Sequence, residues 1–317
     1  MTQPILYLVI PCYNEQEALP STLKTLDELL RTLTEQGKIS PRSRMVFVDD
    51  GSRDATWSLL SSACEENPAV LGIRLAANVG HQNALLAGLM TAKDQCDCCV
   101  SIDADLQDDI TVIPQFLEEY QKGCDIVYGV RNSRTTDSRF KRTTARGFYG
   151  LMRFLGADII PDHADYRLMS RRALEALSEF EEVNLFLRGM VRLVGFRTAT
   201  VSYDRLPRQA GESKFSLRKM LSFAFDGITS FTVKPIRLIW GFGILICLVS
   251  VIAAICTLIS LCCGNSCDSA TALMLSLWFL GGVQLISVGM IGEYVGKTYR
   301  ETKRRPRYII ETILGKD

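Results

Sequence analysis

The stretch Ser101–Gln107 contains two carboxylates one residue apart, Asp103 and Asp105. They follow the apolar run Cys98-Cys99-Val100, which is typical of a buried strand. If that run is a strand, both carboxylates lie near its carboxyl end, where open α/β sheets bind ligands. Carboxylate oxygens suit a hard cation such as Mg²⁺ or Mn²⁺ that is shared with the phosphates of a substrate. An Asp-x-Asp pair is common on its own, so this interpretation needs support from other residues.

Three other polar loops follow apolar runs in the same way. They are Pro11-Cys12-Tyr13-Asn14-Glu15, Asp49-Asp50-Gly51-Ser52-Arg53-Asp54 and Asn78-Val79-Gly80-His81. A loop such as the second is, on its own, more typical of a turn and a helix cap than of a ligand site. Polar loops at the ends of successive parallel strands converge in space, so the four loops together predict one cleft.

The elements that must position these loops alternate between strand-like and helix-like patterns. Short apolar runs cover Ile5–Ile10, Met45–Val48, Val70–Leu75, Cys98–Ile102 and Ile126–Tyr128, and amphipathic stretches lie near 17–35, 54–65, 81–93 and 111–122. This alternation predicts an α/β domain in which a mainly parallel sheet lies between two layers of helices.

Composition limits the classes of function. The 317 residues carry a formal net charge of +1, which does not favour nucleic acid as a partner. The 11 cysteines show no zinc-ligand spacing, and we expect Cys12, Cys64 and Cys124 to fill apolar positions of a reduced domain. An apolar strand pattern follows Pro4 without a basic leader, so we expect the first domain to stay in the cytosol.

Two apolar runs predict transmembrane helices. Ile236–Leu261 contains one charge, Arg237, at its edge, and Ala270–Ile291 contains none. Each run is long enough to cross a hydrocarbon core of about 30 Å, although a buried hairpin in a soluble core is the alternative. Lysines and arginines flank the pair on its outer sides and are absent from the loop Cys262–Ser269. The positive-inside rule therefore predicts a multi-pass protein of the inner (cytoplasmic) membrane with both termini in the cytosol.

The connecting loop and two flanking segments complete the organisation. A disulfide among Cys262, Cys263 and Cys267 stays open. Residues 138–156 predict either a surface helix or a helix at an anionic membrane, and residues 216–233 favour the interfacial alternative. We expect a cytosolic α/β domain over 1–215, an interfacial helix over 216–235, a two-helix transmembrane hairpin over 236–295 and a basic cytosolic tail over 296–317.

The ordered motifs resemble those of glycosyltransferase family 2, whose members have the GT-A nucleotide-sugar fold. The resemblance rests on Pro-x-Tyr-Asn-Glu, Asp-Asp-Gly-Ser-x-Asp, Asn-x-Gly and Asp-Ala-Asp-Leu-Gln in the four loops. The stretches Asp162–Met169 and Gly211–Phe215, followed by two apolar runs, are similar to those of polyprenyl-phosphate glycosyltransferases. That subgroup includes bactoprenol glucosyltransferases, dolichol-phosphate mannose synthases and undecaprenyl-phosphate aminoarabinose transferases. The resemblance covers nearly the whole chain.

This resemblance implies an inverting hexosyl transfer at the membrane. One sugar would pass from a nucleoside diphosphate sugar to a polyprenyl phosphate, giving a lipid monophosphosugar. UDP-glucose and undecaprenyl phosphate are the favoured pair, and GDP-mannose with dolichyl phosphate, or a UDP-aminosugar, are alternatives. A processive synthase would have a Gln-x-x-Arg-Trp motif, which the chain lacks. A non-catalytic membrane scaffold or a lipid translocase component is the alternative from another class, but it would not need Asp103 and Asp105.

The resemblance also implies roles for individual residues. The base and ribose of the donor would be held by Pro11, Tyr13, Glu15, Asp49 and Asp50, and its diphosphate would be addressed by Asp103, Ala104, Asp105 and Gln107. Asp103 and Asp105 would be the ligands of Mg²⁺ or Mn²⁺. The counter-charges for the acceptor phosphate would be Arg131, Arg134, Arg139, Arg205, Arg208 and Lys214, and the catalytic candidates are Asp105, Asp165, Asp162 and Arg205. His81 is at least as typical of a structural histidine as of a ligand.

A phosphate acceptor changes what catalysis requires. A phosphate monoester has a second pKa of about 6, so at neutral pH it is mostly dianionic and already nucleophilic. We therefore predict that Asp165, which matches the family's candidate base, mainly orients the sugar or an arginine, with Asp162 as the second choice. Gly281, Gly282, Gly289 and Gly292 would allow close helix packing between protomers, so we expect a homo-oligomer, for which a tetramer is one option.

Overall fold

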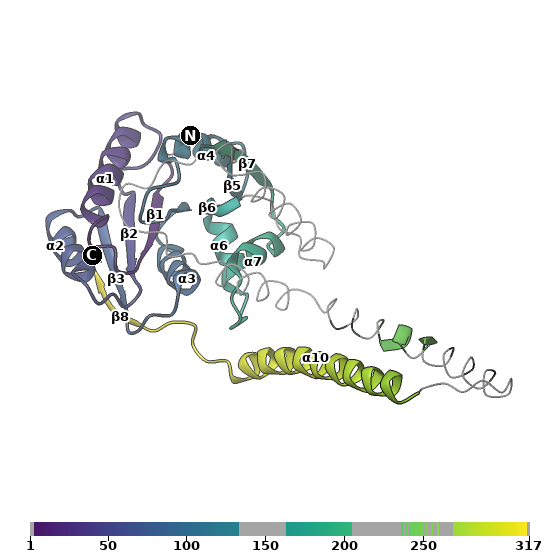
Figure 1. Ribbon diagram of the computed structural model, residues 1–317. Coiled ribbons are helices and arrows are strands. Elements are labelled where there is room, and N and C mark those ends of the chain that lie inside the picture. The colour runs from purple at the N-terminus through teal and green to yellow at the C-terminus, as the bar shows by residue number, and fades with distance from the viewer. Residues whose placement is uncertain are drawn as a thin grey trace. The chain divides into compact units, whose positions relative to one another are not determined.

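The computed structural model describes residues 3–132, 163–204 and 269–315, together with single helical positions between 236 and 259 (Figure 1). The chain divides into two compact units. One comprises 1–149, 159–216 and 304–317, and the other comprises 150–158 and 217–303. Every described strand belongs to the first unit, and the long helix α10 (Ser269–Lys303) belongs to the second.

The first unit is built on one eight-stranded sheet with the order β7-β5-β6-β4-β1-β2-β3-β8. The strands are β1 (Leu6–Cys12), β2 (Arg44–Asp49), β3 (Val70–Leu75), β4 (Cys98–Ser101), β5 (Ile126–Arg131), β6 (His163–Ser170), β7 (Thr198–Tyr203) and β8 (Ile310–Leu314). Only β6 and β8 pair antiparallel with their neighbours among the described strands. The mainly parallel α/β sheet predicted from the sequence is therefore confirmed.

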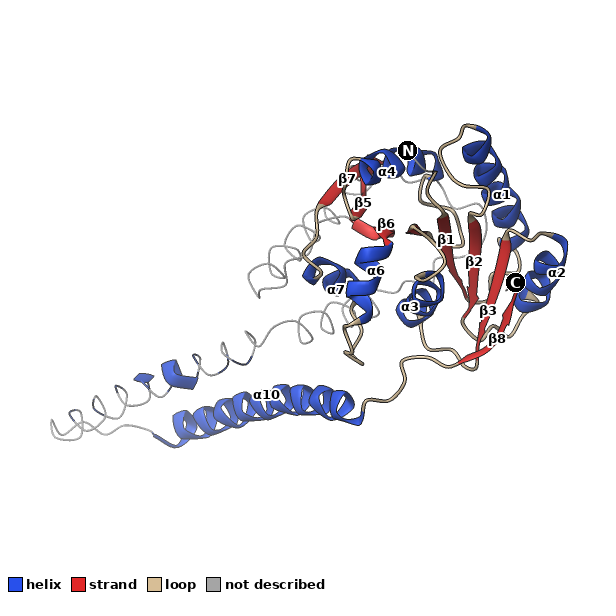
Figure 2. Cartoon of the chain, turned by 180° about the vertical axis from the view of Figure 1, so that it is seen from behind, coloured by secondary structure: helices blue, strands red, loops and turns tan. Residues whose placement is uncertain are grey.

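Helices cover both faces of this sheet (Figure 2). One face carries α1 (Leu19–Glu35), α2 (Thr56–Glu66) and α4 (Ile113–Gln121), and the other carries α3 (His81–Ala92), α6 (Arg171–Ser178) and α7 (Leu187–Leu193). Strand β1 is buried along its whole length: Leu6, Leu8 and Ile10 pack with α1, whereas Val9 lies against α3. Burial on both faces explains why the central strands are continuous apolar runs in the sequence.

The expected elements and the observed ones agree closely in the first 131 residues. All five expected strands and all four expected helices are present, with ends that differ by a few residues. The sequence did not predict β6, β7, β8, α6 or α7. The segment expected as a tail contains the end of α10 and also β8, which pairs with β3 and is held by a 3.3 Å ion pair between Arg74 and Glu311.

The described residues include only part of the segments that the sequence predicts to lie in a membrane. Among the described residues, one helical segment, Phe279–Lys303, is long and apolar enough to cross a membrane, and its most apolar window is not buried. It lies further along the chain than the expected run Ala270–Ile291. Most of the expected first span, the interfacial segment 216–235 and the three loop cysteines lie outside the described residues. Two transmembrane helices are therefore not confirmed.

Helix α3 approaches the sheet closely at Gly88, and this contact gives a test of the core. A Cβ atom at Gly88 would lie 2.4 Å from Cγ1 of Val9 and 2.8 Å from Cγ2 of Val48. Because valine side chains are stiff and the core is close-packed, we expect Gly88→Ala to lower the free energy of unfolding by about 1–3 kcal/mol. Thermal unfolding of the purified protein measures this loss. Adding Val9→Ala should make the double variant less unstable than the sum of the single ones, and strict additivity would contradict the packing argument.

Candidate active site

The loops after β1 and β2 are locked together by hydrogen bonds. Asn14 N–H donates to Ser52 Oγ, and Asn14 Oδ1 accepts from Arg53 N–H, both at 2.9 Å. Glu15 N–H donates to Thr56 Oγ1 at 2.9 Å. Asn14 has a φ of 52°, a left-handed conformation that asparagine tolerates better than most residues. The two loops therefore form one rigid edge, on which Tyr13 is exposed.

Asp50 ties the loop after β3 to the same edge. Its Oδ1 accepts from Val79 N–H at 2.7 Å and its Oδ2 from Gly80 N–H at 3.0 Å. Burial raises the pKa of Asp50, and the two backbone N–H groups oppose that rise. Gly51 has a φ of 66°, and a Cβ there would lie 2.8 Å from Asn78 N. Asp50 thus positions the polypeptide immediately before α3, in addition to the role toward the donor that the family resemblance implies for it.

Asp49 offers a buried oxygen at the same edge. Its Oδ1 accepts from Ser52 N–H at 3.2 Å. Its Oδ2 lies 3.9 Å from Arg74 Nε and has no hydrogen-bond partner among the described residues. Burial raises the pKa of this carboxyl, with hydrogen bonds from Ser52 and the charge of Arg74 acting in the opposite direction. The Asp49 side chain is 0% exposed, so this oxygen is closed to a ligand in the observed arrangement of the loops.

A hydrogen bond from helix α1 fixes the Asp-x-Asp turn, residues 103–105, to the core. The carbonyl of Ala104 accepts from Thr22 Oγ1 of α1 at 2.7 Å, and both residues are buried. Leu106 has a φ of 46° and a buried side chain, and Asp105 Oδ1 accepts from Gln107 N–H at 3.3 Å. The side chain of Asp103, by contrast, is 42% exposed. The turn is therefore fixed to the core while this carboxylate remains accessible.

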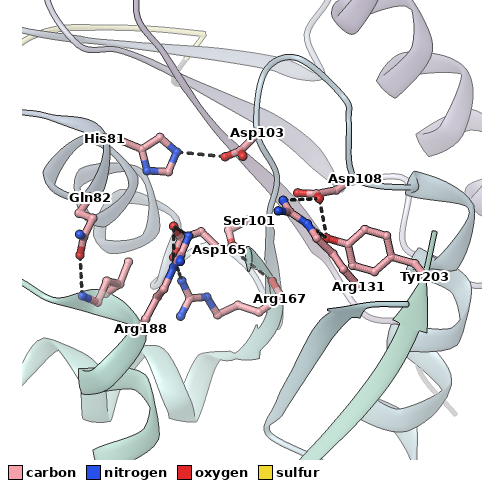
Figure 3. A network of polar contacts seen from close by, with 11 residues as sticks. His81, Gln82, Ser101, Asp103, Asp108, Arg131, Asp165, Arg167, Arg188 and Tyr203 are labelled. Carbon is pink, nitrogen blue, oxygen red and sulfur yellow. Dashed lines mark hydrogen bonds and ion pairs between the residues drawn. The ribbon is translucent and has the colours of Figure 1, made fainter. Parts of the chain in front are cut away.

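His81, at the start of α3, contacts that carboxylate. Its Nε2 lies 3.0 Å from Asp103 Oδ1 (Figure 3). Burial acts to lower the pKa of His81, but the hydrogen bond and charge of Asp103 outweigh it and raise the pKa to about 9. The same contact holds the pKa of Asp103 below its ordinary value against the effect of burial. The contact with Asp103 therefore favours the protonated form of His81, which its position in the sequence did not reveal.

Asp165 lies beside the turn because β6 pairs antiparallel with β4. Ser101 is opposite Arg167 in this pairing, so continuing the register by two residues places position 165 opposite 103. Ser101 Oγ also donates to the backbone carbonyl of Asp165. The sheet therefore brings together two acidic residues that are 62 positions apart in the sequence.

Two arginines hold the Asp165 carboxylate (Figure 3). Arg188 of α7 donates from Nε to Oδ1 at 3.2 Å and from Nη2 to Oδ2 at 3.0 Å, and Arg167 donates from Nη2 to Oδ1. Burial acts to raise the pKa of Asp165, but Arg188, Arg167 and His81 overcome it and hold the pKa well below its usual range. Asp165 is therefore an ionised group that is already engaged on both oxygens.

Arg131, expected as a counter-charge for the acceptor, is engaged within the protein. Its Nη2 lies 3.0 Å from Asp108 Oδ1, and its Nε donates to Tyr203 Oη at 3.2 Å. Tyr203 in turn donates to the same oxygen of Asp108, which is buried. The group thus links the segment after β4 to β5 and β7. The other expected site residues Asp162, Arg134, Arg139, Arg205, Arg208 and Lys214 lie outside the described residues.

Sequence reasoning missed Arg167, Arg188 and Asp108. Arg167 stands two positions after Asp165, and strand alternation would have placed the two side chains on one face. Nothing in the sequence points to Arg188, because α7 has only seven residues and follows Asp165 at a distance.

Asp103 and Asp105 fit a divalent cation that is completed by a substrate. Within the described residues, no three His, Cys, Asp or Glu side chains gather as a metal cage. Mg²⁺ commonly takes one or two carboxylates and completes its shell with water and substrate phosphates. The accessible oxygen of Asp103 and the adjacent Asp105 are donors of that kind.

Known proteins resemble this chain over most of its length. Residues 7–178 match the model of Glycosyl transferase family 2. The chain is 52% identical over 313 residues to the uncharacterized glycosyltransferase YkoT of Bacillus subtilis (strain 168), covering 99% of this chain and 93% of that protein. It is 40% identical over 308 residues to the prophage bactoprenol glucosyl transferase homolog of Escherichia coli (strain K12), covering 96% and 98%. It is also 40% identical over 306 residues to the bactoprenol glucosyl transferase of Shigella phage SfV, covering 96% and 97%. The four polar loops at one edge of this sheet are thus those of a glycosyltransferase, and the chain belongs to glycosyltransferase family 2.

Proposed function

We propose that this glycosyltransferase moves one glucose from UDP-glucose to undecaprenyl phosphate at a membrane, with inversion, and releases a lipid monophosphosugar. The observation that carries this proposal is the 40% identity, over almost the whole chain, to proteins named bactoprenol glucosyl transferases. GDP-mannose with dolichyl phosphate, or a UDP-aminosugar, remain the alternative substrates. They differ from the favoured pair in sugar and nucleotide and not in the reaction.

The donor would lie across the edge formed by the first two loops and the Asp-x-Asp turn. The exposed ring of Tyr13 supports its role toward the base and ribose, and we assign Pro11, Glu15, Asp49 and Asp50 to the same part of the donor. Asp103 and Asp105, with Ala104 and Gln107 in the same turn, would address the diphosphate. Mg²⁺ or Mn²⁺ held there would supply Lewis-acid stabilisation of the departing diphosphate.

No residue of this site needs to act as a general base if the acceptor is a phosphate. The acceptor monoester, with a pKa of about 6, is largely dianionic at neutral pH. Asp165 would be a poor base because two arginines stabilise its ionised form. We therefore assign Asp165 a positioning role toward Arg188. The basic residues Arg205, Arg208 and Lys214 remain candidates for contacts to phosphate, as do Arg134 and Arg139.

The apolar segments support action at a lipid surface. Along α10 the side chains of Leu285, Ile286 and Val288 are exposed, and in the preceding run Leu248, Val249 and Ile252 are exposed too. Exposed apolar side chains on strongly apolar helical segments are typical of contact with lipid. We propose the two-span hairpin over 236–295, the interfacial segment 216–235, both termini in the cytosol and a homo-oligomer, as the sequence predicts.

A transfer assay tests the proposal. Membranes containing the protein are incubated with labelled UDP-glucose, undecaprenyl phosphate and Mg²⁺, in parallel with UDP-N-acetylglucosamine and GDP-mannose. We expect one labelled lipid, which mild acid cleaves to a single sugar, with UDP-glucose as the best donor. Polymer formation, or equal use of all donors, would contradict it.

The metal assignment predicts a specific loss in Asp105→Asn. We expect kcat/KM to fall by about 100-fold or more, because charge on the leaving diphosphate is less well stabilised. UDP binding, measured by titration calorimetry, should weaken in Mg²⁺ but match the wild type in EDTA. Asp94→Asn, which changes an exposed aspartate two residues after the end of α3, is the control. An equal loss of UDP affinity in EDTA would contradict the metal role.

The positioning role of Asp165 predicts how Asp165→Asn responds to pH. Its folded-state pKa lies below the ordinary value, so Asp165 is ionised throughout the range of about pH 5 to 8. The variant should lose turnover because Arg188 is displaced, but its pH profile should keep the shape of the wild-type profile. Disappearance of an ionisation near pH 5 from the variant's profile would instead identify Asp165 as a base.

A further inference from the structure

Two guanidinium groups, those of Arg167 and Arg188, pair with the one carboxylate of Asp165. Arginine stays protonated in proteins, so the three side chains together carry one excess positive charge. A surplus charge in a buried cluster is costly unless a counter-charge is supplied.

Arg167 carries that surplus into the interior. Its side chain is 1% exposed, and its Nε and Nη1 have no hydrogen-bond partner among the described residues. Burial lowers its pKa, with Asp165 acting in the opposite direction. Arg167 lies on the buried side of Asp165 and does not reach solvent. Its charge therefore strengthens the positive potential at the group on the exposed side of Asp165.

Arg188 is the group on the exposed side of Asp165. Its side chain is 30% exposed, compared with 10% for Asp165. Burial acts to lower the pKa of Arg188, whereas Asp165 and then Asp103 raise it, so Arg188 lies within the field of the Asp-x-Asp turn. Figure 3 shows Asp165 between Arg188 and the His81–Asp103 pair. The excess charge therefore meets solvent at the edge where the sugar would be transferred.

A simpler explanation of the two arginines is that they only hold helix α7 to strand β6. This explanation accounts for less of the geometry. Helix α7 is already held by a 2.7 Å hydrogen bond from Leu187 N–H to Gln82 Oε1 and by the buried side chains of Leu187, Met190 and Val191. One arginine would be sufficient to neutralise Asp165. With the second arginine the three side chains carry a net charge of +1, which holding α7 to β6 does not require and which can attract an anion.

We propose that Arg188 binds a phosphate group of a substrate, with Asp165 fixing the orientation of its guanidinium and buried Arg167 reinforcing its charge. This inference rests on the proposed function and deepens it. Guanidinium groups recognise phosphate oxygens through paired, charge-assisted hydrogen bonds. The phosphate belongs either to the diphosphate of the donor or to the monoester of the acceptor, and both have this chemistry.

The test uses the full-length protein and binding measurements that need no turnover. The variants are Arg188→Gln, Arg188→Lys and, as a control, Arg172→Gln, which breaks an Arg–Asp pair with Asp125 beyond the other end of β6. Thermal unfolding first establishes that each variant is folded. UDP and GDP with Mg²⁺ probe the donor subsite by titration calorimetry, and undecaprenyl phosphate in detergent micelles probes the acceptor subsite.

We expect Arg188→Gln to weaken one of these affinities by about 10- to 100-fold, the range for losing hydrogen bonds to a charged group. Arg188→Lys should recover part of that loss, and Arg172→Gln should show none. A loss confined to the nucleotides assigns Arg188 to the donor, and a loss confined to the lipid assigns it to the acceptor. The inference is wrong if Arg188→Gln is folded and binds all probes as the wild type does. If Arg188→Gln does not fold, the same result for Arg188→Lys is the contradicting outcome. If the wild type binds UDP but transfers no glucose to undecaprenyl phosphate, the proposed function is wrong, whereas the inference about Arg188 is not affected.

Discussion

The site depends on one reversal of direction in the sheet. Strand β6 lies antiparallel between β4 and β5, in an arrangement whose other central strands are parallel. Because of this reversal, the beginning of β6 meets the carboxyl end of β4, and Asp165 and Arg167 arrive beside the Asp-x-Asp turn. A parallel strand in the same place would deliver its own carboxyl end there, as β1, β2 and β3 do. The reversal thus adds a charged strand face to an edge that otherwise consists of loops.

The loops at that edge are held by the protein's own polar groups. Asp50 binds two backbone N–H groups of the next loop, and Asn14 and Ser52 join the first loop to the second. Asp165 is likewise fixed by two guanidinium groups before any substrate is present. Groups that are oriented in advance need little reorganisation when charge develops on a substrate, which is the condition for strong electrostatic stabilisation. Several acidic residues that a motif would assign to a ligand therefore serve first to arrange other groups.

The sequence was informative where function and local structure coincide. The Asp-x-Asp turn, the loops before it and the strands that carry them follow from apolar runs and turn residues close to one another in the chain. The partners of Arg131 could not be found in this way, because Asp108 and Tyr203 reach it from other elements of the fold. Arg188 escaped for the same reason: its importance comes from a contact to Asp165 made by a short helix. Strand β8 was hidden by the basic residues that precede it, which are equally typical of a solvated tail.

The position of strand β8 in the sequence also determines when the sheet can be completed during synthesis. It fills the outer edge of β3, yet it is encoded after α10. During translation the edge of β3 therefore stays bare until the apolar helix has left the ribosome, and a bare edge invites pairing with another chain. Completion of the sheet therefore has to wait until α10 has been synthesised. A reporter or affinity tag fused close after residue 314 would hinder the pairing of β8 with β3, because β8 is the last of the described strands to be synthesised.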